Sequence, residues 1–239
     1  MTSAVAPRQA LADAKPVFDW FFGVGVSCVV AIYVRAIYFT PPDALLGLAQ
    51  KIYYLHVPAF LAAYISVSLT ALLSLVYLWL HDERADRLAE ASGEVGLVFL
   101  CVGLSMGSLW ARSSWGTYWV WWDMRLTLTL FLAFIVAAYL VLRSAIEESG
   151  MRARYSAVLG VLAALLIPFI HLSVYLFQAH LHPMPIVLKP DKPSLSGEML
   201  TTFLLSFCAF AVFCVALIRA RYRVGELRAL AAALEEETV

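Results

Sequence analysis

The sequence has few charged residues. Asp, Glu, Lys and Arg make up 14% of its 239 residues, whereas a typical soluble domain carries about 25%. Hydrophobic residues make up 62%, and the formal net charge is zero. This composition excludes an ordinary soluble domain. It predicts an integral membrane protein surrounded by lipid, with no nucleic-acid partner.

Cysteine is also scarce, and its pattern excludes two kinds of chemistry. The chain contains neither a C-x-x-C nor a C-x-x-C-H sequence, which argues against a dithiol oxidoreductase and against covalent c-type haem attachment. All the cysteines fall in apolar stretches, where packed thiols are the simplest interpretation. They are Cys28, Cys101, Cys208 and Cys214.

Long apolar stretches dominate the rest of the chain. A membrane-spanning helix needs roughly 20 mostly apolar residues to cross about 30 Å of hydrocarbon, and continuous runs of this length favour helices over barrel strands. The expected spans are Asp19–Phe39, Tyr54–Leu80, Val95–Trp110, Leu126–Leu142, Tyr155–Phe177 and Met199–Ile218. We therefore predict an all-α membrane protein, a six-helix bundle that forms one domain over residues 1–239.

The basic residues are distributed unequally between the two sides of this bundle. With the N-terminus inside, eleven of the 17 Lys and Arg residues fall on the inner side, so the positive-inside rule predicts that both termini are cytoplasmic. No small-residue cleavage pattern follows a short apolar core near the N-terminus, and we expect the first span to be retained. The loops that precede the second, fourth and sixth spans then share the outer face.

One outer segment, residues 110–127, is rich in tryptophan. It contains five of the seven tryptophans, whereas an interfacial belt would spread them over many helix ends. If the segment is helical, Trp115, Trp119 and Trp122 recur at i, i+4 and i+7 and form one aromatic face. With Trp121 beside it, such a face is a platform for a planar ligand, and an interfacial belt is the alternative.

Four of the five histidines also fall on the outer side: His56, His171, His180 and His182. Each one alone is explained as a polar residue at the membrane interface. Together they suggest another role, because a haem iron takes two axial donors on opposite faces and imidazole is a common metal ligand. His56 with either His180 or His182 could hold a porphyrin between them.

Three charged residues flank the tryptophans. Asp123 is placed to cap the fourth span, which would contribute about 0.5 to 2 kcal/mol. Arg112 and Arg125 are placed to bind carboxylates through charge-assisted hydrogen bonds. If the planar ligand is a porphyrin, its propionates are the candidate anions.

Three motifs together resemble one known family. These are YLHVPA, then W-G-T-x-W-V-W with D-x-R-L-T, and finally I-H-x-S-V followed by L-H. The sequence resembles the cytochrome c maturation protein C family (CcmC, haem exporter protein C), whose members carry a tryptophan-rich WWD domain. The resemblance covers essentially the whole chain, including the number of spans and the order of the loops.

The resemblance implies a non-enzymatic protein of the bacterial inner membrane. It would bind haem b without a covalent bond at the periplasmic face and transfer it to the periplasmic haem chaperone CcmE during c-type cytochrome biogenesis. Its axial ligands would be His56 and His182. It would act with CcmA, CcmB and CcmD, and because this chain has no G-x-x-x-x-G-K-[ST] loop, any ATPase activity would belong to a partner.

The chain departs from the family pattern in two places. W-V-W-W-D replaces W-V-W-D, and on a helix the added residue would rotate Asp123 by about 100° relative to the indoles before it. The distance from Ser173 to His182 is one residue longer than usual, which leaves His180 as a rival ligand, although Leu181 and His182 preserve the L-H pair.

Two other functions are compatible with a haem site. A cytochrome c haem lyase of the same superfamily is one, but those relatives are generally larger. An electron-transfer membrane cytochrome b is the other, and it would place its ligand histidines deep within facing spans.

Overall fold

In the computed structural model of the chain, residues 14, 16–177, 195 and 197–236 are described. Their helices are α2 (Trp20–Val34), the π-helical turn η1 (Arg35–Phe39), the 3-10 helix η2 (Leu48–Ile52), α3 (Tyr53–Leu80), α4 (Glu83–Trp115), α5 (Met124–Ala145), α6 (Ser149–Leu176) and α7 (Gly197–Glu236). Six helical segments are long and apolar enough to cross a membrane. The predicted all-α, six-helix membrane fold is confirmed.

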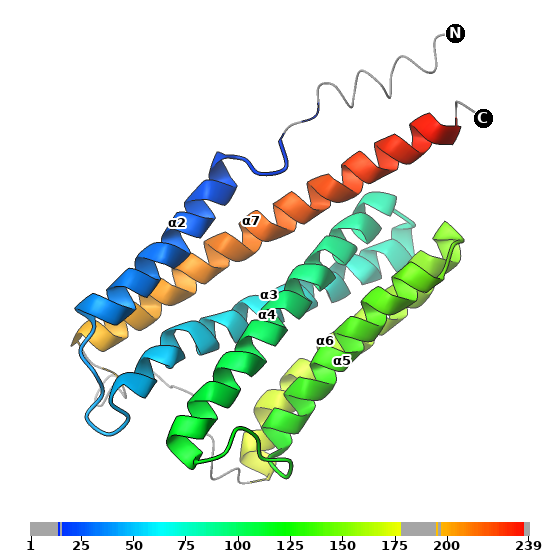
Figure 1. Cartoon of the computed structure of the whole chain (residues 1–239). Helices are drawn as coiled ribbons and strands as arrows, with labels where there is room; N and C mark the ends of the chain where they lie inside the picture. The colour runs from blue at the N-terminus through cyan, green and yellow to red at the C-terminus, as the bar shows by residue number, and fades with distance from the viewer. Residues whose placement is uncertain (1–13, 15, 178–194, 196, 237–239) are drawn as a thin grey trace.

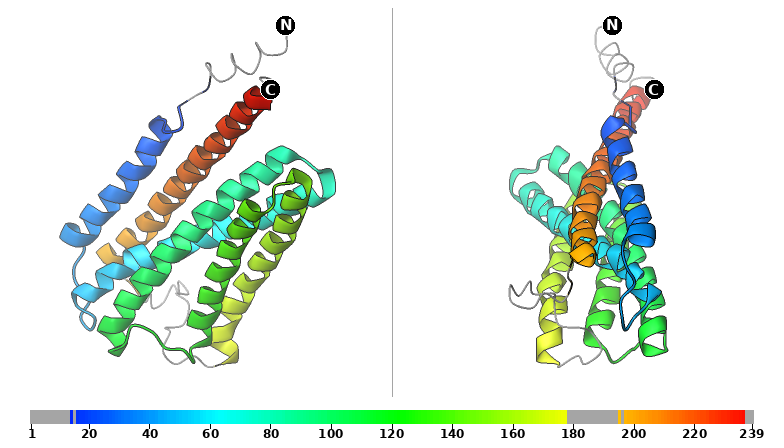
Figure 2. Two further views of the ribbon diagram at one scale, coloured as in Figure 1. Left: turned by 45° about the vertical axis from the view of Figure 1, so that its right-hand side comes forward. Right: turned by 90° about the vertical axis from the view of Figure 1, so that its left-hand side faces the viewer.

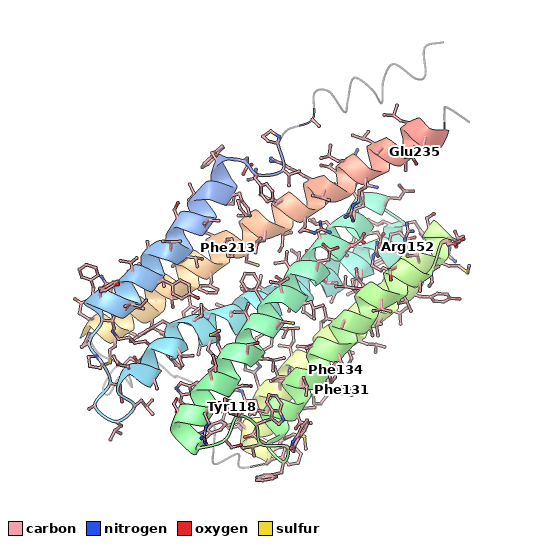
Figure 3. The ribbon with its side chains drawn as sticks, in the orientation of Figure 1. Tyr118, Phe131, Phe134, Arg152, Phe213 and Glu235 are labelled. Atoms are coloured by element: carbon pink, nitrogen blue, oxygen red, sulfur yellow. The ribbon has the colours of Figure 1, made fainter. Side chains whose placement is uncertain are left out.

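The helices form three pairs (Figures 1 and 2). α2 lies against α7, α5 lies against α6, and α3 and α4 pack closely together between these pairs. We call one end of the bundle the tryptophan end; it carries residues 40–52 and 116–123, the last turn of α6 and the first turn of α7. The opposite end, with the turns at residues 81–82 and 146–148, is the charged end. Figure 3 shows Tyr118 at the first end and Arg152 at the second.

Large apolar side chains cover the outside of the bundle, as expected for helices in lipid. On α5, Phe131 and Phe134 are 56% and 61% exposed and are labelled in Figure 3. The interior combines large side chains such as Leu100, Leu132 and Tyr139 with many small residues, and the small residues let α3 and α4 approach closely. A Cβ added to Gly96 of α4 would lie 3.2 Å from the Val67 side chain of α3. Glycine at this position thus lets the two helices pack closely, as small residues do in membrane helices.

Helix α4 begins at Glu83, about three turns before the expected start at Val95. The Asp82 carboxylate caps it by accepting a hydrogen bond from the Arg84 backbone N–H at 2.8 Å. The sequence-based boundary was wrong because the charged residues that follow were assigned to a loop. They lie on the helix, and Asp86, Glu90 and Glu94 are paired with arginines from other helices.

Two arginines neutralise the acidic face of α4. Arg143 of α5, which is 6% exposed, donates to both oxygens of Asp86 at 2.7 and 2.8 Å and to Glu90 at 2.9 Å. Arg221 of α7 donates to Glu94. Bidentate contacts of this kind are the strong form of the arginine–carboxylate interaction. They hold α4, α5 and α7 together at the charged end.

Helix α7 continues beyond the expected end of the sixth span at Ile218 and runs through residue 236. Near the charged end, its Arg219 and Arg223 contact Asp19 at 3.0 and 3.1 Å. Asp19 caps α2 by accepting from the Phe22 backbone N–H at 3.0 Å. This N–H, followed by the two arginines, lowers the pKa of Asp19 below its ordinary value.

Candidate functional site

A cavity of about 460 Å³ lies at the tryptophan end, within the usual range for small-molecule sites. Residues from α3, α4, α5, α6, α7 and the 116–123 loop line it. Most of the lining is aromatic or aliphatic. The polar side chains of the wall include two histidines, an arginine and two hydroxyl groups: His56, His171, Arg125, Ser108 and Thr129.

His56 lies in the first turn of α3 and is held against α4. Its Nδ1 is 2.9 Å from the Gly103 carbonyl oxygen. Because a carbonyl can only accept, Nδ1 carries the hydrogen, and a neutral ring then has its lone pair on Nε2. Metal-binding histidines are oriented in the same way, by donating the hydrogen of the other ring nitrogen to a fixed acceptor. The structure therefore gives His56 the tautomer that a ligand requires.

Two glycines of α4 make room for this arrangement. A Cβ on Gly107 would lie 2.6 Å from His56 Cε1, and a Cβ on Gly103 would lie 2.9 Å from the Phe60 ring. Phe60 in turn meets the His56 ring edge to face, at a centroid distance of 4.9 Å. The G-x-x-x-G pair of α4 therefore packs against the histidine ring and its aromatic neighbour.

The tryptophan-rich segment is not one continuous helix. Helix α4 ends at Trp115, and Gly116 follows in the left-handed region with φ 77°, a conformation that glycine adopts readily. Residues 116–123 form a loop, and the single aromatic face expected of a helix does not form. Because a loop has no helical register, the added residue in W-V-W-W-D does not rotate Asp123 as it would on a helix.

The loop divides the tryptophans into two groups. Trp115 and Trp119 line the cavity together with Trp110, and Trp110 meets Trp115 edge to face at 5.4 Å. Trp121 and Trp122 are 69% and 85% exposed and lie outside the cavity wall that the described residues form.

Two indole N–H groups of the wall lack a hydrogen-bond acceptor. Nε1 of Trp110 and Nε1 of Trp119 are buried and have no partner among the described residues. Buried donors are nearly always satisfied in folded proteins, so each exception calls for an explanation. A bound ligand that supplies a hydrogen-bond acceptor is an explanation that fits the position of these two groups in the cavity wall.

Arg125 lies in the first turn of α5, on the cavity wall. It is half-buried, and no carboxylate of the described residues forms an ion pair with it. A cation in a largely apolar wall is costly unless an anion meets it. Within the described part of the chain, the cavity therefore combines apolar surface with one cation that no carboxylate pairs with.

The other two charged residues of the segment have structural contacts. Asp123 is 5% exposed and caps α5, accepting from the Leu126 backbone N–H at 3.1 Å, as predicted. Arg112 is exposed, donates to the Gly116 carbonyl and lies 5.7 Å from the centre of the Tyr118 ring. It thereby satisfies a carbonyl at the C-terminus of α4. Neither residue belongs to the cavity wall described here.

Of the expected site residues, the structure thus brings His56, Trp115, Trp119 and Arg125 around one cavity. His180 and His182 lie outside the described residues. Sequence reasoning placed His171 on the outer side but left it out of the site, although it lines the same cavity. An ionisable residue within an apolar span was the available signal.

Comparisons with known proteins agree in one assignment. A family model described as heme exporter protein C (CcmC) matches residues 1–235. Among curated proteins, heme exporter protein C of Bradyrhizobium diazoefficiens is 33% identical over 226 residues, covering 93% of this chain and 83% of that protein. Heme exporter protein C of Haemophilus influenzae is 30% identical over 86% of this chain and 80% of its own length. The protein of the same name from Paracoccus denitrificans is 28% identical over 97% and 95%.

Proposed function

The chain belongs to the heme exporter protein C family, and on this basis we propose that it binds haem in the cavity at its tryptophan end and passes it on. The observation that carries the proposal is His56. Its Nδ1 lies 2.9 Å from the Gly103 carbonyl oxygen, so the lone pair of the neutral ring is on Nε2, the nitrogen that would bind iron. The ring belongs to a cavity of suitable size with aromatic walls.

The remaining wall residues match the other parts of a porphyrin. The indoles of Trp115 and Trp119 offer flat apolar surfaces for the macrocycle, and Arg125 offers a cation for a propionate. The indole N–H groups of Trp110 and Trp119, which have no acceptor within the described part of the chain, can donate to carboxylate oxygens. Trp121, Trp122, Asp123 and Arg112 were also expected to contact haem. Because Trp121 and Trp122 are exposed, we assign them to its outer edge.

The second axial ligand is proposed to be His182, with His180 as its rival. With His56 it would give the iron the two axial donors of a six-coordinate haem. The haem is haem b and is not covalently attached. In support, the chain has no C-x-x-C-H sequence to form thioether bonds. A cargo held only by coordination and packing can be released, which suits a transfer protein.

We assign the tryptophan end to the periplasmic face of the bacterial inner membrane. The distribution of Lys and Arg supports this orientation, since the charged end carries most of them. From there the haem would pass to the chaperone CcmE. The chain would work as a non-enzymatic subunit with CcmA, CcmB and CcmD, and ATP hydrolysis would belong to CcmA.

The proposal can be tested by purifying the protein in detergent with haem and CcmE. The wild type should show a Soret band and copurify with the chaperone in a haem-dependent way. His56→Ala should lose most of the bound haem. The matched control is His81→Asn, at the charged end, where φ is 55° and Asn is tolerated; it should bind as the wild type does.

Two results would contradict the proposal. One is the absence of a Soret band from wild-type protein supplied with haem. The other is an unchanged spectrum in the double variant His56→Ala/His182→Ala. Reduction of the bound haem by a quinol would instead favour an electron-transfer cytochrome b.

A further inference from the structure

A second histidine, His171 of α6, lines the same cavity as His56. It is exposed although it belongs to the cavity wall, so it lies at the rim where the cavity meets the outside of the bundle. Two other wall residues are exposed in the same way, Leu61 of α3 and Leu204 of α7, at 39% and 46%. All three lie within spans apolar enough to be surrounded by lipid. This part of the rim therefore faces the membrane.

His171 has the same ring geometry as His56. Its Nδ1 is 3.0 Å from the carbonyl oxygen of Ile167, one turn earlier on its own helix. The carbonyl accepts, so Nδ1 carries the hydrogen and the lone pair of the neutral ring is on Nε2. The ring also meets Tyr64 edge to face at a centroid distance of 5.3 Å. Its orientation is thus fixed from two sides.

A row of aromatic side chains connects the two histidines. On α3, His56 meets Phe60 at 4.9 Å and Phe60 stacks on Tyr64 at 6.0 Å, and Tyr64 then meets His171. The residues His56, Phe60 and Tyr64 are spaced by one turn each, so Tyr64 is about 12 Å further along α3 than His56. His171 therefore lies deeper in the membrane than His56, at the other end of one continuous apolar wall.

An ionisable side chain at the lipid-facing surface of a span is unfavourable, and such residues usually mark a pathway for an ion or a substrate. Within the described part of the chain, His171 makes its hydrogen bond to its own helix, a contact that any residue with a suitable donor could make. The contact explains the orientation of the ring but not the presence of histidine. An iron ligand at the membrane-facing rim of a haem site explains both.

We propose that His171 is a second iron-binding position, where haem arriving from the membrane binds before it reaches His56. The inference rests on the proposed function of the cavity. Nε2 of His171 donates its lone pair to the iron as haem passes the rim beside Leu61 and Leu204. The Fe–N bond to His171 then breaks and the Fe–N bond to His56 forms, with no change in iron oxidation state and no proton transferred. Phe60 and Tyr64 provide the surface along which the macrocycle moves.

The test compares haem spectra and uptake rates in four proteins. They are the wild type, His56→Ala, His171→Leu, and the double variant His56→Ala/His171→Leu, each reconstituted without haem in phosphatidylcholine vesicles. The control is Leu172→Ala, the next residue on α6, which is also exposed but is not in the cavity wall. Haem is added to the vesicles, and the Soret band is followed with time and at equilibrium.

Two results are expected together. His171→Leu should reach nearly the wild-type Soret band at equilibrium, because His56 is intact. It should do so about tenfold more slowly, which corresponds to about 1.4 kcal/mol in the barrier to uptake. His56→Ala should keep a weaker, shifted Soret band. The double variant still has the proposed ligand His182, but it should lose the part of that band that His171 contributes. His171→Met should restore the rate with an altered spectrum, since a thioether also binds haem iron.

The proposal is overturned if His171→Leu takes up haem at the rate of Leu172→Ala. It is equally overturned if His56→Ala and the double variant have the same spectrum. Failure of the proposed function would be recognised separately, because the wild type itself would then show no Soret band.

Discussion

The substitution Gly107→Ala tests how the His56 ring is positioned. The added Cβ would lie 2.6 Å from His56 Cε1 and 3.0 Å from Nδ1, whereas carbon atoms in contact are about 3.5 to 4.0 Å apart. The ring must therefore move by about 1 Å. That shift is large compared with the tolerance of a hydrogen bond of 2.9 Å to the Gly103 carbonyl, so the contact that sets the tautomer is lost.

We expect this loss to weaken haem binding more than it weakens the fold. Removing a contact that orients a metal ligand typically costs 10- to 100-fold in affinity, which corresponds to about 1.4 to 2.8 kcal/mol. The fold loses less, because the atom in the way is the end of a side chain that can rotate. The measurements are the dissociation constant for haem, from titration of the Soret band, and the thermal unfolding temperature in detergent.

Two variants serve as controls. Gly23→Ala lies in α2, where no atom is within 4 Å of the added Cβ, and it should leave haem affinity unchanged and stabilise the helix slightly. In a His56→Ala background the clash is gone, so Gly107→Ala should no longer lower the unfolding temperature. Wild-type haem affinity in Gly107→Ala, or an equal loss of stability in both backgrounds, would refute the reasoning.

Two further predictions concern the capping carboxylates. Asp123→Ala should lower the stability of the protein by about 1 kcal/mol through loss of the α5 cap. Asp123→Asn should retain most of the stability, because an amide oxygen can also accept the capping hydrogen bond. Thermal unfolding in detergent distinguishes the two variants, and equal losses in both would argue against a capping role. The lowered pKa of Asp19 means that its contribution is complete above its unfolded pKa of about 3.9 and is lost as the pH falls through the lower folded value. Unfolding temperatures measured from pH 7 down to pH 3 should therefore fall more steeply for the wild type than for Asp19→Asn, and parallel curves would contradict this linkage.

The sequence predicted the number of spans correctly because a continuous apolar run has few alternatives in a membrane. It misplaced the start of α4, since Asp86 and Glu90 look like loop residues until the arginine that neutralises them is known. Arg143 is more than fifty residues further along the chain. Pairing over that distance is a property of the packed bundle and leaves no local pattern.

Part of the candidate site was predictable from the sequence, and part depended on how the helices pack. The sequence motifs, together with the side of the membrane on which each loop falls, predicted four residues that lie around one cavity: His56, Trp115, Trp119 and Arg125. The helical face through Trp122 did not form, because Gly116 ends α4 with a positive φ. His171 was missed because the sequence does not show which face of α6 turns toward α3.

The acidic face of α4 has a consequence for the order in which the protein is assembled. Asp86, Glu90 and Glu94 leave the ribosome before Arg143, and long before Arg221. Until those arginines arrive, the three carboxylates lack the cross-helix partners that they have in the bundle, which disfavours their burial in lipid. We therefore expect the charged end of the bundle to close last, after synthesis of the final helix, so that a chain truncated before α7 would insert its helices without completing the bundle.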